Sequence, residues 1–215
     1  MSSHSNTGIW AAAQRGDISS LCAMIEAKAA VDARDTDKMT PLHHAAQNGH
    51  SAAVQVLIES NADVDALNDL PKTPLCLAAE KGHAAVVQML IDAKANIDVF
   101  SRHGTALHFA SKHGRNSVVH VLINAKANVN AVNRRGRTPL HLAVEMGRSA
   151  TVQILVDANA DIDAIDLFDY TPLLLAIEKD HLEIVNILLN AKADPDLPDV
   201  SIPLLEAIDR GYIAI

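Results

Sequence analysis

The sequence predicts an all-α solenoid in which short helix-turn-helix units stack in one row and carry projecting β-hairpin loops. Two phrases that recur in phase lead to this prediction. The first, TPLHHA at residues 40–45, returns in related form with spacings of 33, 32, 33 and 33 residues, at Thr73, Thr105, Thr138 and Thr171. The second, DVDA at residues 63–66, returns at Asn96, Asn128 and Asp161. A unit of this length cannot bury its own apolar face, so its neighbours have to supply the core.

Each copy of the first phrase is expected to begin a short inner helix. The threonine accepts hydrogen bonds from free backbone N–H groups at the helix start, and proline at the next position has no N–H to leave unpaired. Glycines that can adopt the left-handed conformation end these helices, and they are Gly49, Gly82, Gly114 and Gly147. Asp180 replaces this glycine in one unit, which should cost about 1 kcal/mol if the conformation is kept.

A second apolar run in each unit, such as residues 54–58 or 184–189, is expected to form an outer helix. The Asp/Asn phrase then leads into a projecting loop before the next threonine. From Asp98 to Thr105 this loop is one residue shorter than from Asp65 to Thr73. We therefore expect the shorter loop to bend differently and to offer a partner's side chain a place to enter.

The period and the T-P-L-H-x-A phrase resemble the ankyrin repeat from about Thr7 to the end of the chain. The resemblance implies one domain, with a degenerate first repeat at 1–33, five full repeats and a partial repeat at 198–215. The full repeats are 34–66, 67–99, 100–131, 132–164 and 165–197. Where the family usually has glycine after the outer helix, this chain has residues that we interpret as helix caps, namely Lys28, Asn61, Lys94, Lys126, Asn159 and Lys192.

The amino-acid composition limits which residues can form the core, which classes of partner are expected and which cellular compartment fits the chain. Hydrophobic residues make up 49% of the chain but aromatic residues only 3%, so the core has to consist mainly of Ala, Val, Ile and Leu. A net charge of −8 opposes general attraction to nucleic acid or anionic membranes. Cys22 and Cys76 stand apart from any metal-binding pattern, and no secretion signal or membrane-spanning run is recognised. We expect a monomer in the cytoplasm, or in a host cell's cytoplasm if it is a translocated effector.

The resemblance implies a protein-binding adaptor or scaffold whose partner contacts the hairpin tips and the concave side of the inner helices. In the fourth to sixth repeats these positions are basic and aromatic, and such residues are enriched at binding hot spots. We predict that the partner supplies an acidic or phosphorylated segment with apolar anchors. The predicted binding residues are Phe100, Arg102, His103, Lys112, His113, Arg134, Arg135, Arg137, Glu145, Met146, Phe168, Tyr170 and Lys179.

Alternatives to this interpretation stay open at this point. The arginines could simply be solvated, and Phe168 or Tyr170 could pack across neighbouring loops. The same cluster could recognise nucleic acid or a phosphorylated small molecule, although the acidic net charge disfavours this. The chain could also be the ankyrin arm of a larger protein, because the sequence ends where an outer helix should begin.

Chemical signatures of catalysis are missing from the sequence. It has no G-x-S-x-G motif and no phosphate-binding glycine-rich loop, and its acidic pairs fall in exposed turns. Of the eleven histidines, His43, His108 and His141 occupy the phrase's own histidine position. The others lack the helical pairing with a carboxylate that a zinc site would need. We therefore expect no enzymatic activity, no metal and no cofactor.

Overall fold

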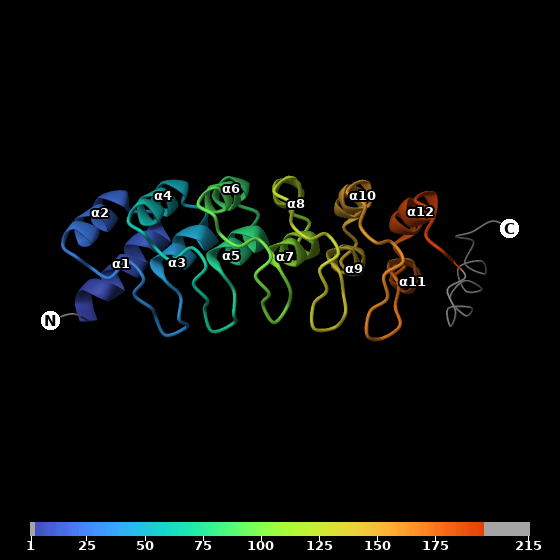
Figure 1. Ribbon diagram of the computed structural model, residues 1–215, viewed down its shortest axis with the longest axis horizontal. Coiled ribbons are helices and arrows are strands. Elements are labelled where there is room, and N and C mark those ends of the chain that lie inside the picture. Colours follow the sequence, from blue (N-terminus) through green and yellow to red (C-terminus); the bar gives the residue numbers. More distant parts are fainter. Residues whose placement is uncertain (1–2, 196–215) are drawn as a thin grey trace.

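The computed structural model describes residues 3–195, and this part of the chain contains twelve helices and no strand. The helices form six pairs in a row (Figure 1), which confirms the predicted all-α solenoid. The inner helices are α1 (Ser3–Arg15), α3 (Pro41–Asn48), α5 (Pro74–Lys81), α7 (Ala106–Lys112), α9 (Pro139–Glu145) and α11 (Pro172–Glu178). The outer helices are α2 (Ile18–Glu26), α4 (Ser51–Glu59), α6 (Ala84–Asp92), α8 (Asn116–Asn124), α10 (Ser149–Asp157) and α12 (Leu182–Asn190). The predicted partial repeat at 198–215 lies outside the described residues.

The inner helices begin as the sequence predicts, and in the three phrases that have a histidine its side chain adds a contact to the next unit. The side chain of Thr40 caps α3, and the backbone N–H of Thr40 donates to Nδ1 of His43 over 3.1 Å. Nε2 of His43 lies 3.0 Å from the carbonyl oxygen of Lys72, so it is the nitrogen that donates. His108 and His141 repeat this arrangement two and three units further on. Burial lowers the pKa of His43 and His108 to about 4, although the hydrogen bond to the next unit acts in the opposite direction.

The helix ends use left-handed backbone throughout. Gly49 ends α3 at φ 73°, and Asp180 keeps the same conformation at φ 59°. The residues interpreted as caps of the outer helices are themselves left-handed, with φ between 58° and 68°. Four of these six residues are lysines. Glycine adopts the left-handed conformation without a steric cost because it has no Cβ, whereas the Cβ of lysine clashes with the backbone there.

The core runs continuously between the two layers of helices. The leucine at the third position of each phrase is buried together with the alanines that follow, and outer-helix residues such as Val54 and Leu57 close over them. Cys76 is buried and Cys22 half-buried, both as free thiols. Inner helices pack on inner helices and outer helices on outer helices, so each unit completes its core only through its neighbours.

Loops project from one side of the row, and we call them fingers; they comprise residues 29–39, 62–72, 95–104, 127–137 and 160–170 (Figure 1). Side-chain hydrogen bonds and single backbone hydrogen bonds across the loop, rather than paired strands, hold their shape. Asp166, for example, accepts hydrogen bonds from the backbone N–H groups of Phe168 and Tyr170. The hairpin detail of the prediction is not confirmed, since the fingers contain only an isolated bridge between Ser101 and Gly104 within the described residues.

The Asp/Asn phrase connects each finger to the next. The carboxylate of Asp65 accepts a hydrogen bond from the backbone N–H of Asn96 over 2.9 Å, and Asn130 accepts one from the N–H of Asp161 over 2.8 Å. Further out, the N–H of Leu167 donates to the carbonyl of Arg135 over 3.0 Å. The fingers are therefore held in a fixed row, which sets the surface they present.

Candidate functional site

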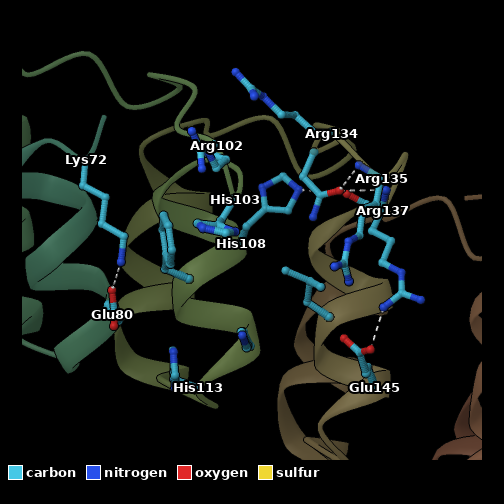
Figure 2. Close-up of a pocket in the computed structure, with 14 residues that line it drawn as sticks. Lys72, Glu80, Arg102, His103, His108, His113, Arg134, Arg135, Arg137 and Glu145 are labelled. Atoms are coloured by element: carbon cyan, nitrogen blue, oxygen red, sulfur yellow. Dashed lines mark hydrogen bonds and ion pairs between the residues drawn. The ribbon is translucent and has the colours of Figure 1, made fainter. Parts of the chain in front are cut away.

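A hollow of about 630 Å³ opens on the side of the inner helices that carries the fingers. It extends from α5 across α7 to α9, and the fingers 95–104 and 127–137 border it (Figure 2). We call it the basic hollow. It brings together eight of the thirteen predicted binding residues, namely Arg102, His103, Lys112, His113, Arg134, Arg135, Arg137 and Glu145.

The remaining five predicted residues lie outside the basic hollow. Phe100 and Phe168 are exposed at finger tips, with 46% and 58% of their surface accessible, and Met146 is 40% accessible at the end of α9. Tyr170 is half-buried against the core, and its hydroxyl hydrogen-bonds to Glu178, which also pairs with Lys179 over 3.0 Å. The basic and aromatic parts of the predicted cluster are thus separate features.

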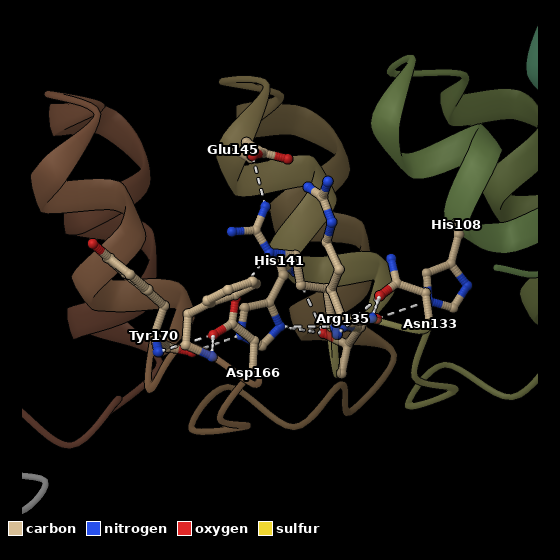
Figure 3. Close-up of polar contacts among 10 residues, drawn as sticks. His108, Asn133, Arg135, His141, Glu145, Asp166 and Tyr170 are labelled. Carbon is tan, nitrogen blue, oxygen red and sulfur yellow. Dashed lines mark hydrogen bonds and ion pairs between the residues drawn. The ribbon is translucent and has the colours of Figure 1, made fainter. Parts of the chain in front are cut away.

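Arg137 is buried and already has two acidic partners. Its Nε lies 2.8 Å from Oδ2 of Asp166, and its Nη1 lies 2.6 Å from Oε1 of Glu145. Burial alone would raise the pKa of Asp166, but the hydrogen bonds from Arg137 and from two backbone N–H groups lower it below its ordinary value. Figure 3 shows this network, which joins the finger 127–137 to the finger 160–170 and to α9. Arg137 therefore supports the wall of the hollow.

The other predicted cations of the hollow are exposed and unpaired. No acidic side chain in the described part of the chain forms an ion pair with Arg102, Lys112, Arg134 or Arg135. The lining includes six Lys or Arg residues and only two Glu, both of which are occupied by partners. The hollow is therefore a concentrated positive region on an acidic protein.

Two histidines of the hollow have pKa values below the ordinary value. Burial lowers the pKa of His103, and the cations Lys72, Lys112, Arg102 and Arg135 lower it further. The pKa of His113 is lowered as well, by burial first; Glu80 acts in the opposite direction, and the neighbouring cations Lys112, Arg115 and Arg148 act with the burial. An imidazole in this hollow is accordingly neutral near physiological pH, and an anion bound beside it would favour its protonated form.

The floor of the hollow contains residues that the sequence analysis did not select. Phe109 and Leu142 are buried there, and Nζ of Lys72 lies 4.4 Å from the centre of the Phe109 ring and 2.5 Å from Oε2 of Glu80. Phe109 occupies the variable position of the T-P-L-H-x-A phrase, where the other copies have His or Leu. The aromatic residue at this position is the sequence feature that could have identified Phe109 as part of the site.

The arrangement suits binding of an anionic group over an apolar surface. Arginine offers several donors in a planar fork, which fits carboxylates and phosphates. Within residues 3–195, no group of three His, Cys, Asp or Glu side chains lies close enough to hold a metal ion. None of the helices described is both long and apolar enough to cross a membrane.

Comparisons with known proteins give a consistent result. A family model for ankyrin repeats matches residues 9–102 and 107–199. Among solved structures, the human ASB11 ankyrin repeat domain is similar at 25% identity and a TM-score of 0.82, covering 92% of this chain and 96% of that one. An ankyrin repeat domain from Acinetobacter baumannii is 31% identical with a TM-score of 0.78, covering 86% of this chain and 98% of its own. None of the curated proteins matches the chain.

Proposed function

The chain belongs to the ankyrin-repeat family, whose members are generally protein-protein interaction modules, and on this premise we propose that it binds a partner protein through the basic hollow. The partner supplies an acidic or phosphorylated segment. The observation that carries this proposal is the set of four exposed cations without acidic partners above an apolar floor, formed by Arg102, Lys112, Arg134 and Arg135.

Charge distribution supports this class of partner. The chain as a whole has a net charge of −8, so acidic segments are repelled over most of its surface and attracted at the hollow. Such a distribution orients an approaching partner and disfavours binding elsewhere. Phe109 and Leu142 beneath the cations add an apolar surface, next to which charge-assisted hydrogen bonds are less exposed to water.

Affinity for the partner would depend chiefly on the arginines at the tip of the finger 127–137. Arg134 and Arg135 are exposed, and their side chains have no ion pair to lose in the unbound protein. Reversing both charges should weaken binding by at least about thirtyfold, which corresponds to about 2 kcal/mol and is the size of a hot-spot effect.

The experiment compares the wild-type chain with Arg134→Glu/Arg135→Glu in binding to displayed acidic peptides, with binding to phosphorylated peptides as a second arm. Lys94→Glu/Lys126→Glu is the matched control, because it changes the net charge equally at exposed ends of outer helices. Loss of binding only in the arginine variant supports the proposal. Equal binding by all three proteins contradicts it.

We further propose that the chain acts as a monomeric, non-enzymatic adaptor or scaffold in the cytoplasm. The two free cysteines agree with a reducing compartment, and burial raises the pKa of Cys76, which leaves this thiol unreactive. Fractionation of cells and sedimentation of the purified chain test the location and the monomeric state. Recovery from a secreted fraction, or a dimer at low concentration, would overturn this part.

A further inference from the structure

A second hollow, of about 360 Å³, lies next to the basic hollow on the same side of the solenoid. It lies between the fingers 29–39 and 62–72 and the inner helices α3 and α5. Its apolar lining is Met39, Leu70 and Leu77. We call it the apolar hollow, and nothing in the predicted set of binding residues belongs to it.

The two hollows share Lys72 and Glu80. Lys72 is held by its ion pair with Glu80 (Figure 2) and by its position over the Phe109 ring. Both side chains of the pair are largely covered, with 12% and 21% of their surface accessible. A fixed ion pair therefore lies where the two hollows meet, and one extended segment that passes over this pair can occupy both.

The chemistry of the apolar hollow differs from that of its neighbour. Leu70 is 56% exposed at its mouth and Leu77 is buried at its floor. Met39, a residue that adapts to differently shaped partners, completes the apolar surface. Asp37 and Asp69 lie at the rim, and only Asp69 has a cation, Lys38 at 2.7 Å. An acidic side chain is repelled here, whereas an apolar one gains buried surface.

We propose that the two hollows form one bipartite site for an extended segment of a partner protein, with an apolar side chain in the apolar hollow and acidic or phosphorylated side chains in the basic hollow. This inference rests on the proposed function. It adds that the partner's motif has two separate parts, each assigned to its own hollow, since the acidic rim excludes the anionic part from the apolar hollow. The volume of the smaller hollow suits one large aliphatic or aromatic side chain.

A phage-displayed library of random peptides, selected on the immobilised full chain, provides the probe. Enriched peptides should share an apolar residue at a constant separation from an acidic cluster. Synthetic copies of an enriched peptide, measured by fluorescence polarisation, then test each hollow. Leu70→Asp should weaken binding by about tenfold or more, since it adds a third acidic group beside an apolar side chain. Leu67→Asp is the control, because Leu67 is 41% exposed on the same finger and lines neither hollow.

A double-mutant cycle separates the apolar contact from a general loss of folding. Replacing the peptide's apolar residue by alanine should weaken binding to the wild-type chain by a similar factor, and should have little further effect on Leu70→Asp. Circular dichroism of Leu70→Asp checks that the helices remain. In a second arm, phosphoserine replaces the acidic residues, and tighter binding identifies phosphate as the preferred anion.

The outcomes distinguish this inference from the proposed function. Purely acidic peptides that bind Leu70→Asp as tightly as the wild-type chain would overturn the bipartite site and leave the proposed function intact. A selection that yields no peptide lost by Arg134→Glu/Arg135→Glu would contradict the proposed function itself. Peptides that lose affinity both for Leu70→Asp and for Arg134→Glu/Arg135→Glu, and that carry an apolar residue at a constant separation from an acidic cluster, support the bipartite site and the proposed function.

Discussion

Mild acid should destabilise this protein more than its carboxylates alone would predict, because buried neutral histidines connect the repeats. His43 and His108 have a pKa of about 4 in the folded chain, compared with about 6.5 when exposed. As the pH falls below about 6.5, the unfolded chain takes up protons that the folded chain does not. The free energy of unfolding therefore falls between about pH 6.5 and pH 4, and this contribution is fully present above that range.

The size of the effect follows from these values. Moving from about pH 7 to about pH 5 lowers the free energy of unfolding by about 2 kcal/mol for each such histidine. His43 and His108 together give about 4 kcal/mol, and the lowered pKa of His141 acts in the same direction. Asp17 and Asp166 have pKa values below the ordinary aspartate value. Their contribution to the free energy of unfolding is therefore lost only at a lower pH than that of the histidines.

Urea unfolding followed by circular dichroism at the two pH values measures this difference. His108→Gln can still donate a hydrogen bond but does not titrate, so the pH-dependent loss should shrink by about 2 kcal/mol while stability at neutral pH also falls. His120→Gln is the control, since His120 is exposed on α8. The reasoning would be refuted if wild type and His108→Gln lost the same free energy between the two pH values.

Two further predictions concern backbone strain and the buried ion pair. Asp180→Gly should raise the free energy of unfolding by about 1 kcal/mol, because Asp180 is left-handed at φ 59°. Lys179→Gly is the control and should not raise it, because Lys179 has an ordinary φ of −84°. Thermal denaturation of the two variants measures the difference. Arg137→Met should lower the free energy of unfolding by about 3 kcal/mol, since it leaves Asp166 buried without its cation. Arg135→Met, on the exposed part of the same finger, should stay close to wild type in the same urea titration, and equal losses in the two variants would contradict a structural role for Arg137.

Local rules predicted the helices well, because caps and helix-ending residues act within a few positions. Thr40 caps α3 and Gly49 ends it as expected. The lysines after the outer helices directly follow the residues that cap these helices, as Lys94 follows Ala93. Their own left-handed conformation was not foreseen, since lysine has no local preference for it. Propensity alone could not show that the fold imposes this backbone on an unfavourable residue.

The candidate site was predictable only in part, because its contacts join different repeats. Arg137 was grouped with the exposed arginines, yet its partner Asp166 lies in the next finger. Lys72 was not among the predicted binding residues, although it contacts Phe109 in the following unit. The apolar hollow combines residues from two fingers, and no single stretch of sequence contains its pattern.

The hydrogen bonds that connect consecutive fingers have a consequence for how such a gene can change length. Asp65 contacts Asn96, and Asn130 contacts Asp161, so at each of these junctions the third residue of one Asp/Asn phrase meets the first residue of the next. Duplication or loss of a whole period recreates junctions of the same chemistry and demands no new compensating substitutions. The shorter finger 95–104 breaks this regularity beside the basic hollow. Recombination between units can therefore lengthen the solenoid, while the basic hollow is inherited only with that particular unit and its neighbours.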